Sequence, residues 1–79
     1  MDPQAIIDLI QNGIPGAQAT CTGDGSHFDA TVISDAFEGK NTLARQRLVF
    51  GALGDAITSG RLHNLNLRTL TRAEAGQAG

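Results

Sequence analysis

The spacing of apolar residues near the start of the chain predicts a helix over about Pro3 to Asn12. Three isoleucines in that stretch recur at helical spacing and would share one face. Asp2 followed by a proline is typical of a helix start, because aspartate can cap the first N–H groups and proline suits the first turn. Gly13 favours an end to the helix, and Pro15-Gly16 predicts a turn after it.

Two segments with a two-residue period follow this helix. Residues 17–22 and residues 28–33 alternate small or apolar side chains with polar ones, which predicts two half-buried strands. The glycine-rich segment Gly23–Ser26 between them predicts a hairpin turn. Cys21 falls on the apolar side of the first strand, so we expect a small core side chain there.

A longer helix is expected from a cap at Asn41 or Thr42 to a stop at Gly60. Gly51 and Gly54 would lie inside it, each at a cost of about 1 kcal/mol relative to alanine, and would allow close packing on the sheet. The apolar positions predicted for this helix are Leu43, Val49, Phe50, Leu53, Ala56 and Ile57.

A third alternating run predicts a strand over roughly His63 to Thr69. Thr71-x-x-Glu74 resembles a capping box, which predicts a last short helix and a frayed tail within residues 72–79, the tail running from about Ala75. The element order is then α-β-β-α-β-α. Because a helix joins the second and third strands, these strands are parallel if they share a sheet. The pattern therefore predicts an α+β fold.

The chain has two histidines, His27 and His63, and each stands where a predicted strand begins. If those strands are neighbours, both residues lie at one edge of the sheet, beside the Gly23–Ser26 turn. Imidazole is a metal ligand and a near-neutral acid or base, so this edge is where we expect a function. The structural alternatives are a solvated turn residue for His27 and a partly buried strand residue for His63. Asp24 is a further candidate oxygen ligand.

Composition narrows the class of protein. With 79 residues the chain is expected to form a single domain over residues 1–79, with an aliphatic core because it has three phenylalanines and no tryptophan or tyrosine. A single cysteine excludes an internal disulfide and a zinc site with two thiolates from one chain. No apolar run approaches the ~20 residues that span a membrane, and the N-terminus carries acids, so we expect a cytoplasmic protein.

Charge is distributed unevenly along the chain. Six acidic residues and no lysine or arginine precede Lys40, whereas six basic and two acidic residues follow from that point. Lys40, Arg45 and Arg47 stand around the start of the second helix and are candidate ligands for phosphates or partner carboxylates, with a solvated helix face as the alternative. No serine or cysteine has a recognisable base and orienting acid, so no nucleophilic triad is predicted.

Five segments in order along the chain point to one family. They are Gly-Asp-Gly-Ser-His-Phe from Gly23, Ser-Asp-Ala-Phe-Glu-Gly-Lys from Ser34, Arg-Gln-Arg-Leu-Val-Phe from Arg45, Leu-His-Asn-Leu from Leu62 and Thr-Leu-Thr-Arg-Ala-Glu from Thr69. Together they resemble the BolA family, most closely its bacterial IbaG branch. No single segment is specific, but the ordered set is.

This resemblance implies a class II K-homology-like fold, with a three-stranded mixed sheet and helices on one face, and no known enzymatic activity. It also implies pairing with a monothiol glutaredoxin of the Cys-Gly-Phe-Ser type and a shared 2Fe–2S cluster, with glutathione supplied through the glutaredoxin. His63 matches the family's C-terminal histidine, which is a cluster ligand. The family's second ligand comes from the loop between the first two strands. Here Gly23–Ser26 holds neither histidine nor cysteine, so His27 is the nearest candidate.

We therefore expect a non-enzymatic protein of iron–sulfur cluster trafficking or iron-linked regulation, which is a monomer or weak homodimer when alone. One or two imidazoles cannot hold a cluster, so the partner must supply thiolates. The alternative function is a DNA-binding regulator of stress or cell-envelope genes, which would use Lys40, Arg45 and Arg47 on phosphates. Gln46 departs from the family pattern, because many members have histidine in an Arg-His-Arg motif.

Overall fold

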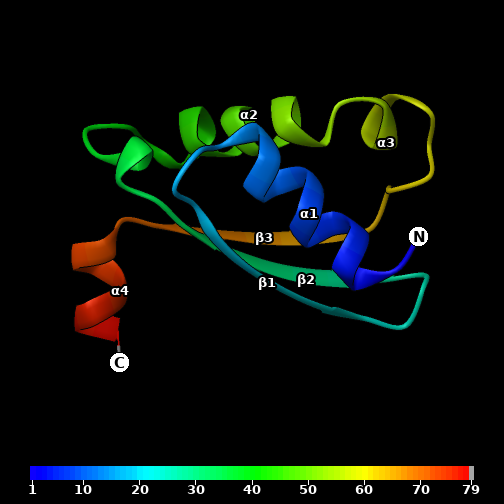
Figure 1. The fold of residues 1–79 in the computed structure, drawn as a ribbon, viewed down its shortest axis with the longest axis horizontal. Helices are drawn as coiled ribbons and strands as arrows, with labels where there is room; N and C mark the ends of the chain where they lie inside the picture. The colour runs from blue at the N-terminus through cyan, green and yellow to red at the C-terminus, as the bar shows by residue number, and fades with distance from the viewer. Residues whose placement is uncertain (79) are drawn as a thin grey trace.

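In the computed structural model, which describes residues 1–78, helices and strands follow one another in the predicted order (Figure 1). One short 3-10 turn, η1, is added after the second strand. The elements are α1 (Pro3–Gly13), β1 (Gln18–Gly23), β2 (Phe28–Ile33), η1 (Asp35–Phe37), α2 (Thr42–Leu53), α3 (Asp55–Thr58), β3 (Leu65–Leu70) and α4 (Arg72–Ala78). None of these helices is long and apolar enough to cross a membrane.

The three strands form one mixed sheet in the order β1-β2-β3. β1 and β2 make an antiparallel hairpin, with Gly23 opposite Phe28 beside the turn. β2 and β3 are parallel, with Phe28 opposite Leu65. The predicted parallel neighbours are therefore confirmed. The β1–β2 turn and the entry to β3 reach the same end of the sheet in Figure 1, and α4 lies at the opposite end.

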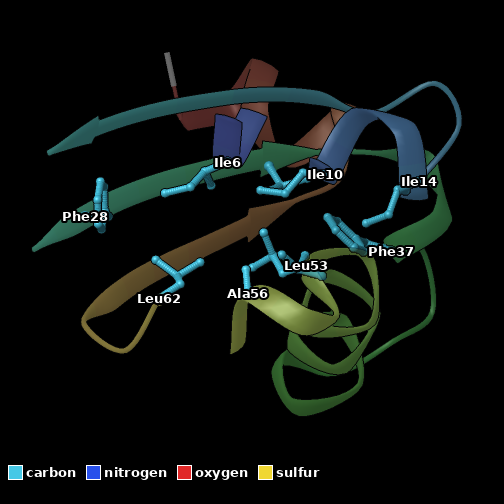
Figure 2. Packing of buried hydrophobic residues seen from close by; sticks show 10 residues of the cluster. Ile6, Ile10, Ile14, Phe28, Phe37, Leu53, Ala56 and Leu62 are labelled. Carbon is cyan, nitrogen blue, oxygen red and sulfur yellow. The ribbon is translucent and has the colours of Figure 1, made fainter. Parts of the chain in front are cut away.

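Helices α1 and α2 cover one face of the sheet, which confirms the predicted arrangement (Figure 1). Asp2 caps α1, because its Oδ1 accepts the Ala5 N–H at 2.8 Å. Ile6 and Ile10 of α1 are fully buried, and Phe28 brings a strand side chain into the same core (Figure 2). The core is aliphatic apart from two phenylalanines; its other members are Ile14, Val32, Phe37, Val49, Leu53, Ala56 and Leu62.

The prediction of one long helix up to Gly60 is wrong, because the helix breaks at Gly54. That residue has φ +51° and ψ −120°, which glycine adopts without the steric cost of a Cβ atom. Its N–H donates to Phe50 O at 2.9 Å and closes the last turn of α2. The four-residue α3 then begins at Asp55. The prediction that Gly51 allows close packing on the sheet is also wrong, since a Cβ atom there would meet nothing within 4 Å.

The third strand and the last helix also differ from their predicted limits. β3 begins at Leu65, so His63 lies two residues before it. The predicted capping box is confirmed: Thr71 N–H donates to Glu74 Oε1 at 2.8 Å, and Glu74 N–H donates to Thr71 Oγ1 at 3.1 Å. The predicted last short helix spans Arg72–Ala78, so it continues past Ala75, where the tail was expected to begin. Residue 79 lies outside the described residues.

Candidate functional site

His63 stands on the connection between α3 and β3, held from both sides. Leu62 before it is buried and donates its N–H to Ala56 O at 2.9 Å, and Leu65 after it packs against the core. The His63 side chain itself is exposed. The anchored backbone therefore presents a solvent-accessible imidazole at a fixed place in the fold.

One nitrogen of this ring is already used. His63 Nδ1 lies 3.0 Å from the carbonyl oxygen of Gly60. A carbonyl oxygen can only accept, so Nδ1 carries the proton in this contact, and the neutral ring has its lone pair on Nε2. Nε2 has no hydrogen-bond partner among residues 1–78. This is the arrangement of a metal-binding histidine, in which a backbone carbonyl orients the ring and fixes the tautomer.

His27 is held differently, by its backbone. Its N–H and that of Ser26 donate to Asp24 Oδ1 at 2.9 and 2.8 Å, and its carbonyl accepts the Asp24 N–H. These two donors lower the pKa of the Asp24 carboxyl. Asp24 therefore holds the turn through Oδ1. The His27 side chain is exposed and makes no hydrogen bond within residues 1–78.

The chain segments that carry the two histidines lie at the same end of the sheet. Phe28 N–H donates to Asn64 O at 2.8 Å, so the residues following His27 and His63 are hydrogen-bonded neighbours. A hollow beside His63 is lined by Phe50, Ile57, Leu62 and Leu65, and His27 is not among its lining residues. Within residues 1–78, no group of three or more His, Cys, Asp or Glu could hold a metal. Metal binding here would thus need donors from another molecule.

Cys21 offers no thiolate to this end of the sheet. It packs against the core from β1, as the strand pattern predicted, and is half-buried. Burial raises the pKa of its thiol, and the negative charge of Asp29 raises it further. The protonated thiol is a poor metal ligand.

The three basic candidates around α2 are not equivalent. Lys40 and Arg47 are exposed, whereas the Arg45 side chain is only 13% exposed. Arg45 Nε donates to the carbonyl oxygens of Phe37 and Lys40 at 3.1 and 2.8 Å, and its guanidinium lies 5.9 Å from the centre of the Phe37 ring. Arg45 is therefore part of the fold, and the basic surface suggested for DNA phosphates loses its central member.

Arg45 also anchors the last helix. Its Nη1 donates to Glu74 Oε1 at 2.7 Å, and its Nη2 donates to Glu74 Oε2 at 3.3 Å. The same carboxylate also accepts the N–H of Thr71, the residue just before α4. These hydrogen bonds lower the pKa of Glu74 below its ordinary value of 4.5, and the bond from Arg45 has a larger effect than the bond from the Thr71 N–H. One carboxylate thus joins α4 to α2.

We expect this contact to make stability depend on pH. A lowered carboxyl pKa in the folded state stabilises the fold at pH values above the ordinary 4.5, and that contribution is lost as pH falls through the folded-state pKa below 4.5. Arg45→Met should therefore lower the Tm clearly at pH 7 and by less at pH 3. Thermal unfolding followed by circular dichroism at both pH values measures this. Arg47→Met is the matched control, and an Arg45→Met effect that is equal at both pH values would contradict the expectation.

Sequence reasoning missed the apolar surface next to His63. Phe50 was expected on the apolar side of the second helix, but its side chain is 41% exposed and lines the hollow. Leu43, from the same predicted set, is 56% exposed. An available signal was the spacing of Leu43, Arg47 and Phe50, which places all three on one helix face that cannot be wholly buried.

Comparison with known proteins finds relatives that cover most of this chain. The family model described as BolA-like protein matches residues 10–74. The acid stress protein IbaG of Escherichia coli is 28% identical over 74 residues, covering 94% of this chain and 88% of that protein. SufE-like protein 1 of Arabidopsis thaliana is 38% identical over 63 residues, which are 78% of this chain and 17% of that protein.

Solved structures include the same fold. The structure of a bolA protein homologue from Coxiella burnetii superimposes with a TM-score of 0.87 and is 36% identical, covering 96% of this chain and 97% of that one. The order of helices and strands, and the mixed sheet, are therefore those of a solved relative.

Proposed function

The chain belongs to the BolA-like protein family, and we propose that it is a non-enzymatic partner of a monothiol glutaredoxin with which it shares a 2Fe–2S cluster. The proposed role is cluster trafficking or iron-linked regulation. One observation carries it: His63 presents an exposed imidazole whose Nδ1 is held by Gly60 O, which leaves Nε2 as a lone-pair donor.

The donor set supports a shared cluster over a metal held by this chain alone. Residues 1–78 offer no group of three metal-binding side chains, and the thiol of Cys21 has a raised pKa. Imidazole is a known replacement for thiolate at a 2Fe–2S centre, so one histidine can complete a site whose thiolates belong to a partner. His27, at the same end of the sheet, is the second proposed ligand.

The test is to titrate the chain into a monothiol glutaredoxin loaded with its glutathione-ligated 2Fe–2S cluster, without oxygen. Replacing a thiolate by imidazole changes the electronic environment of the iron, so we expect new bands in visible absorption and circular dichroism that saturate at a fixed ratio of the two proteins. The cluster-free glutaredoxin gives the baseline. A cluster spectrum that stays unchanged at excess chain would refute the proposal.

A further inference from the structure

The hollow beside His63 adjoins a stretch of the β3 edge that is open among the described residues. β3 is an edge strand, because the sheet order is β1-β2-β3. Phe28 N–H donates to Asn64 O, and Ser34 N–H donates to Leu70 O, so the even-numbered residues of this strand face β2. In a parallel ladder the residues between them, Leu65 and Leu67, then direct their backbone groups away from the sheet.

Both edges of the sheet are partly closed by side chains. On β1, the outward N–H of Ala19 donates to Gln11 Oε1 at 3.2 Å. On β3, Thr69 O accepts a long bond from Arg45 Nη1 at 3.5 Å. Leu65 and Leu67 have no such partner among residues 1–78. The open stretch therefore lies at the end of β3 that is nearest to His63. An unpaired edge of this kind is a template for a strand from another molecule.

Apolar side chains continue this surface onto the helices. Phe50 of α2 is 41% exposed and lines the hollow together with Ile57 and Leu65. Phe50 lies on the other side of α2 from Ala52, which approaches Gly13 of α1 and is two residues, about 200°, further round the helix. The exposed phenylalanine and the open strand edge thus belong to the same side of the molecule.

Two exposed arginines are close in the chain to residues that line the hollow. Arg47 is exposed one turn before Phe50, and Arg61 is exposed two residues before His63. Neither makes a salt bridge within residues 1–78, and Asp55 is the only carboxylate between residues 41 and 63. A partner that covers this surface is therefore favoured if it brings carboxylates.

We infer that the cluster-sharing partner docks here, laying an extended segment along Leu65–Leu67 and an apolar side chain into the hollow, with acidic side chains toward Arg47 and Arg61. The identity of the partner is taken from the proposed function. The partner's thiolates must lie within coordination distance of the iron that His63 binds, so the partner has to cover the rim of this hollow. Phe50 is the exposed apolar anchor that it would bury.

Two exposed apolar residues of α2 provide a matched comparison. Phe50 lines the hollow, whereas Leu48 is 38% exposed, lies on the other side of the helix and does not line it. We expect Phe50→Ser to weaken binding of the glutaredoxin at least tenfold by calorimetry, and Leu48→Ser to change it less than twofold. Binding is measured with cluster-free and cluster-loaded glutaredoxin. Unchanged far-ultraviolet circular dichroism and Tm show that each variant is folded.

Hydrogen exchange gives a second readout that needs no variant. Formation of the complex should slow exchange of the outward Leu65 and Leu67 amides, while the Cys21 amide on β1, at the opposite edge of the sheet, stays unchanged. If the wild-type chain binds glutaredoxin in neither form, the proposed function and this inference both fail. If it binds, but Phe50→Ser and Leu48→Ser behave alike or Leu65 and Leu67 exchange at their free rates, only the docking surface is refuted.

Discussion

Replacing His63 by alanine is expected to abolish the spectral change that the chain produces in cluster-loaded glutaredoxin. The imidazole is exposed and its Nδ1 is fixed on Gly60 O, so the variant removes a preorganised nitrogen donor and no packed side chain. We therefore expect its Tm to stay close to that of the wild type. Visible circular dichroism of the mixture measures the loss of ligation, and thermal unfolding of the variant alone shows that the fold is intact.

His27→Ala is the internal comparison for this experiment. The His27 backbone closes the turn with Asp24, and alanine keeps those backbone bonds. Because the His27 ring has no bond within residues 1–78 that orients it, we expect its loss to shift the bands while a complex still forms. A His63→Ala mixture with the wild-type spectrum would exclude His63 as a ligand. A His27→Ala mixture with the wild-type spectrum would exclude only His27.

Short-range signals made much of this fold predictable. Asp2 and the Thr71–Glu74 pair cap helices as expected, because a cap depends on residues two or three positions away. The parallel pairing of β2 and β3 followed from the helix between them, which allows few other arrangements. This pairing also brings the chain segments that carry His27 and His63 to one end of the sheet, as their positions in the sequence suggested.

Features set by distant contacts could not be predicted in the same way. Arg45 reaches Glu74, 29 positions along the chain, and no local pattern distinguishes it from exposed Arg47. A glycine in a helical pattern can either remain inside the helix or break it with a positive φ, and the sequence does not distinguish these. Gly54 breaks the helix. Phe50 is exposed because the buried side of α2 is fixed by Val49 and Leu53, which meet the core.

The crossing of α1 and α2 gives a second large effect, this time on stability. Gly13 ends α1, and a Cβ atom there would lie 2.5 Å from Ala52 Cβ and 2.9 Å from its Cα. Such a contact requires the helices to move apart, since backbone atoms are involved. We expect Gly13→Ala to lower the free energy of unfolding by about 1–3 kcal/mol, the usual cost of overpacking. Denaturant unfolding measures this free energy.

The opposite sign is expected at Gly51, in the middle of α2. A Cβ atom there meets nothing within 4 Å, and the residue has no positive φ, so Gly51→Ala should raise the free energy of unfolding by up to about 1 kcal/mol through helix propensity alone.

The cause of the Gly13 effect can be isolated by removing the opposing atom. Ala52→Gly deletes the Cβ that a residue 13 side chain would strike, at its own cost of about 1 kcal/mol in helix propensity. If the loss in Gly13→Ala is steric, the double variant is more stable than the sum of the two single losses allows, and the coupling equals the relieved clash. Strict additivity would mean that the Ala52 Cβ atom is not the cause of the loss in Gly13→Ala.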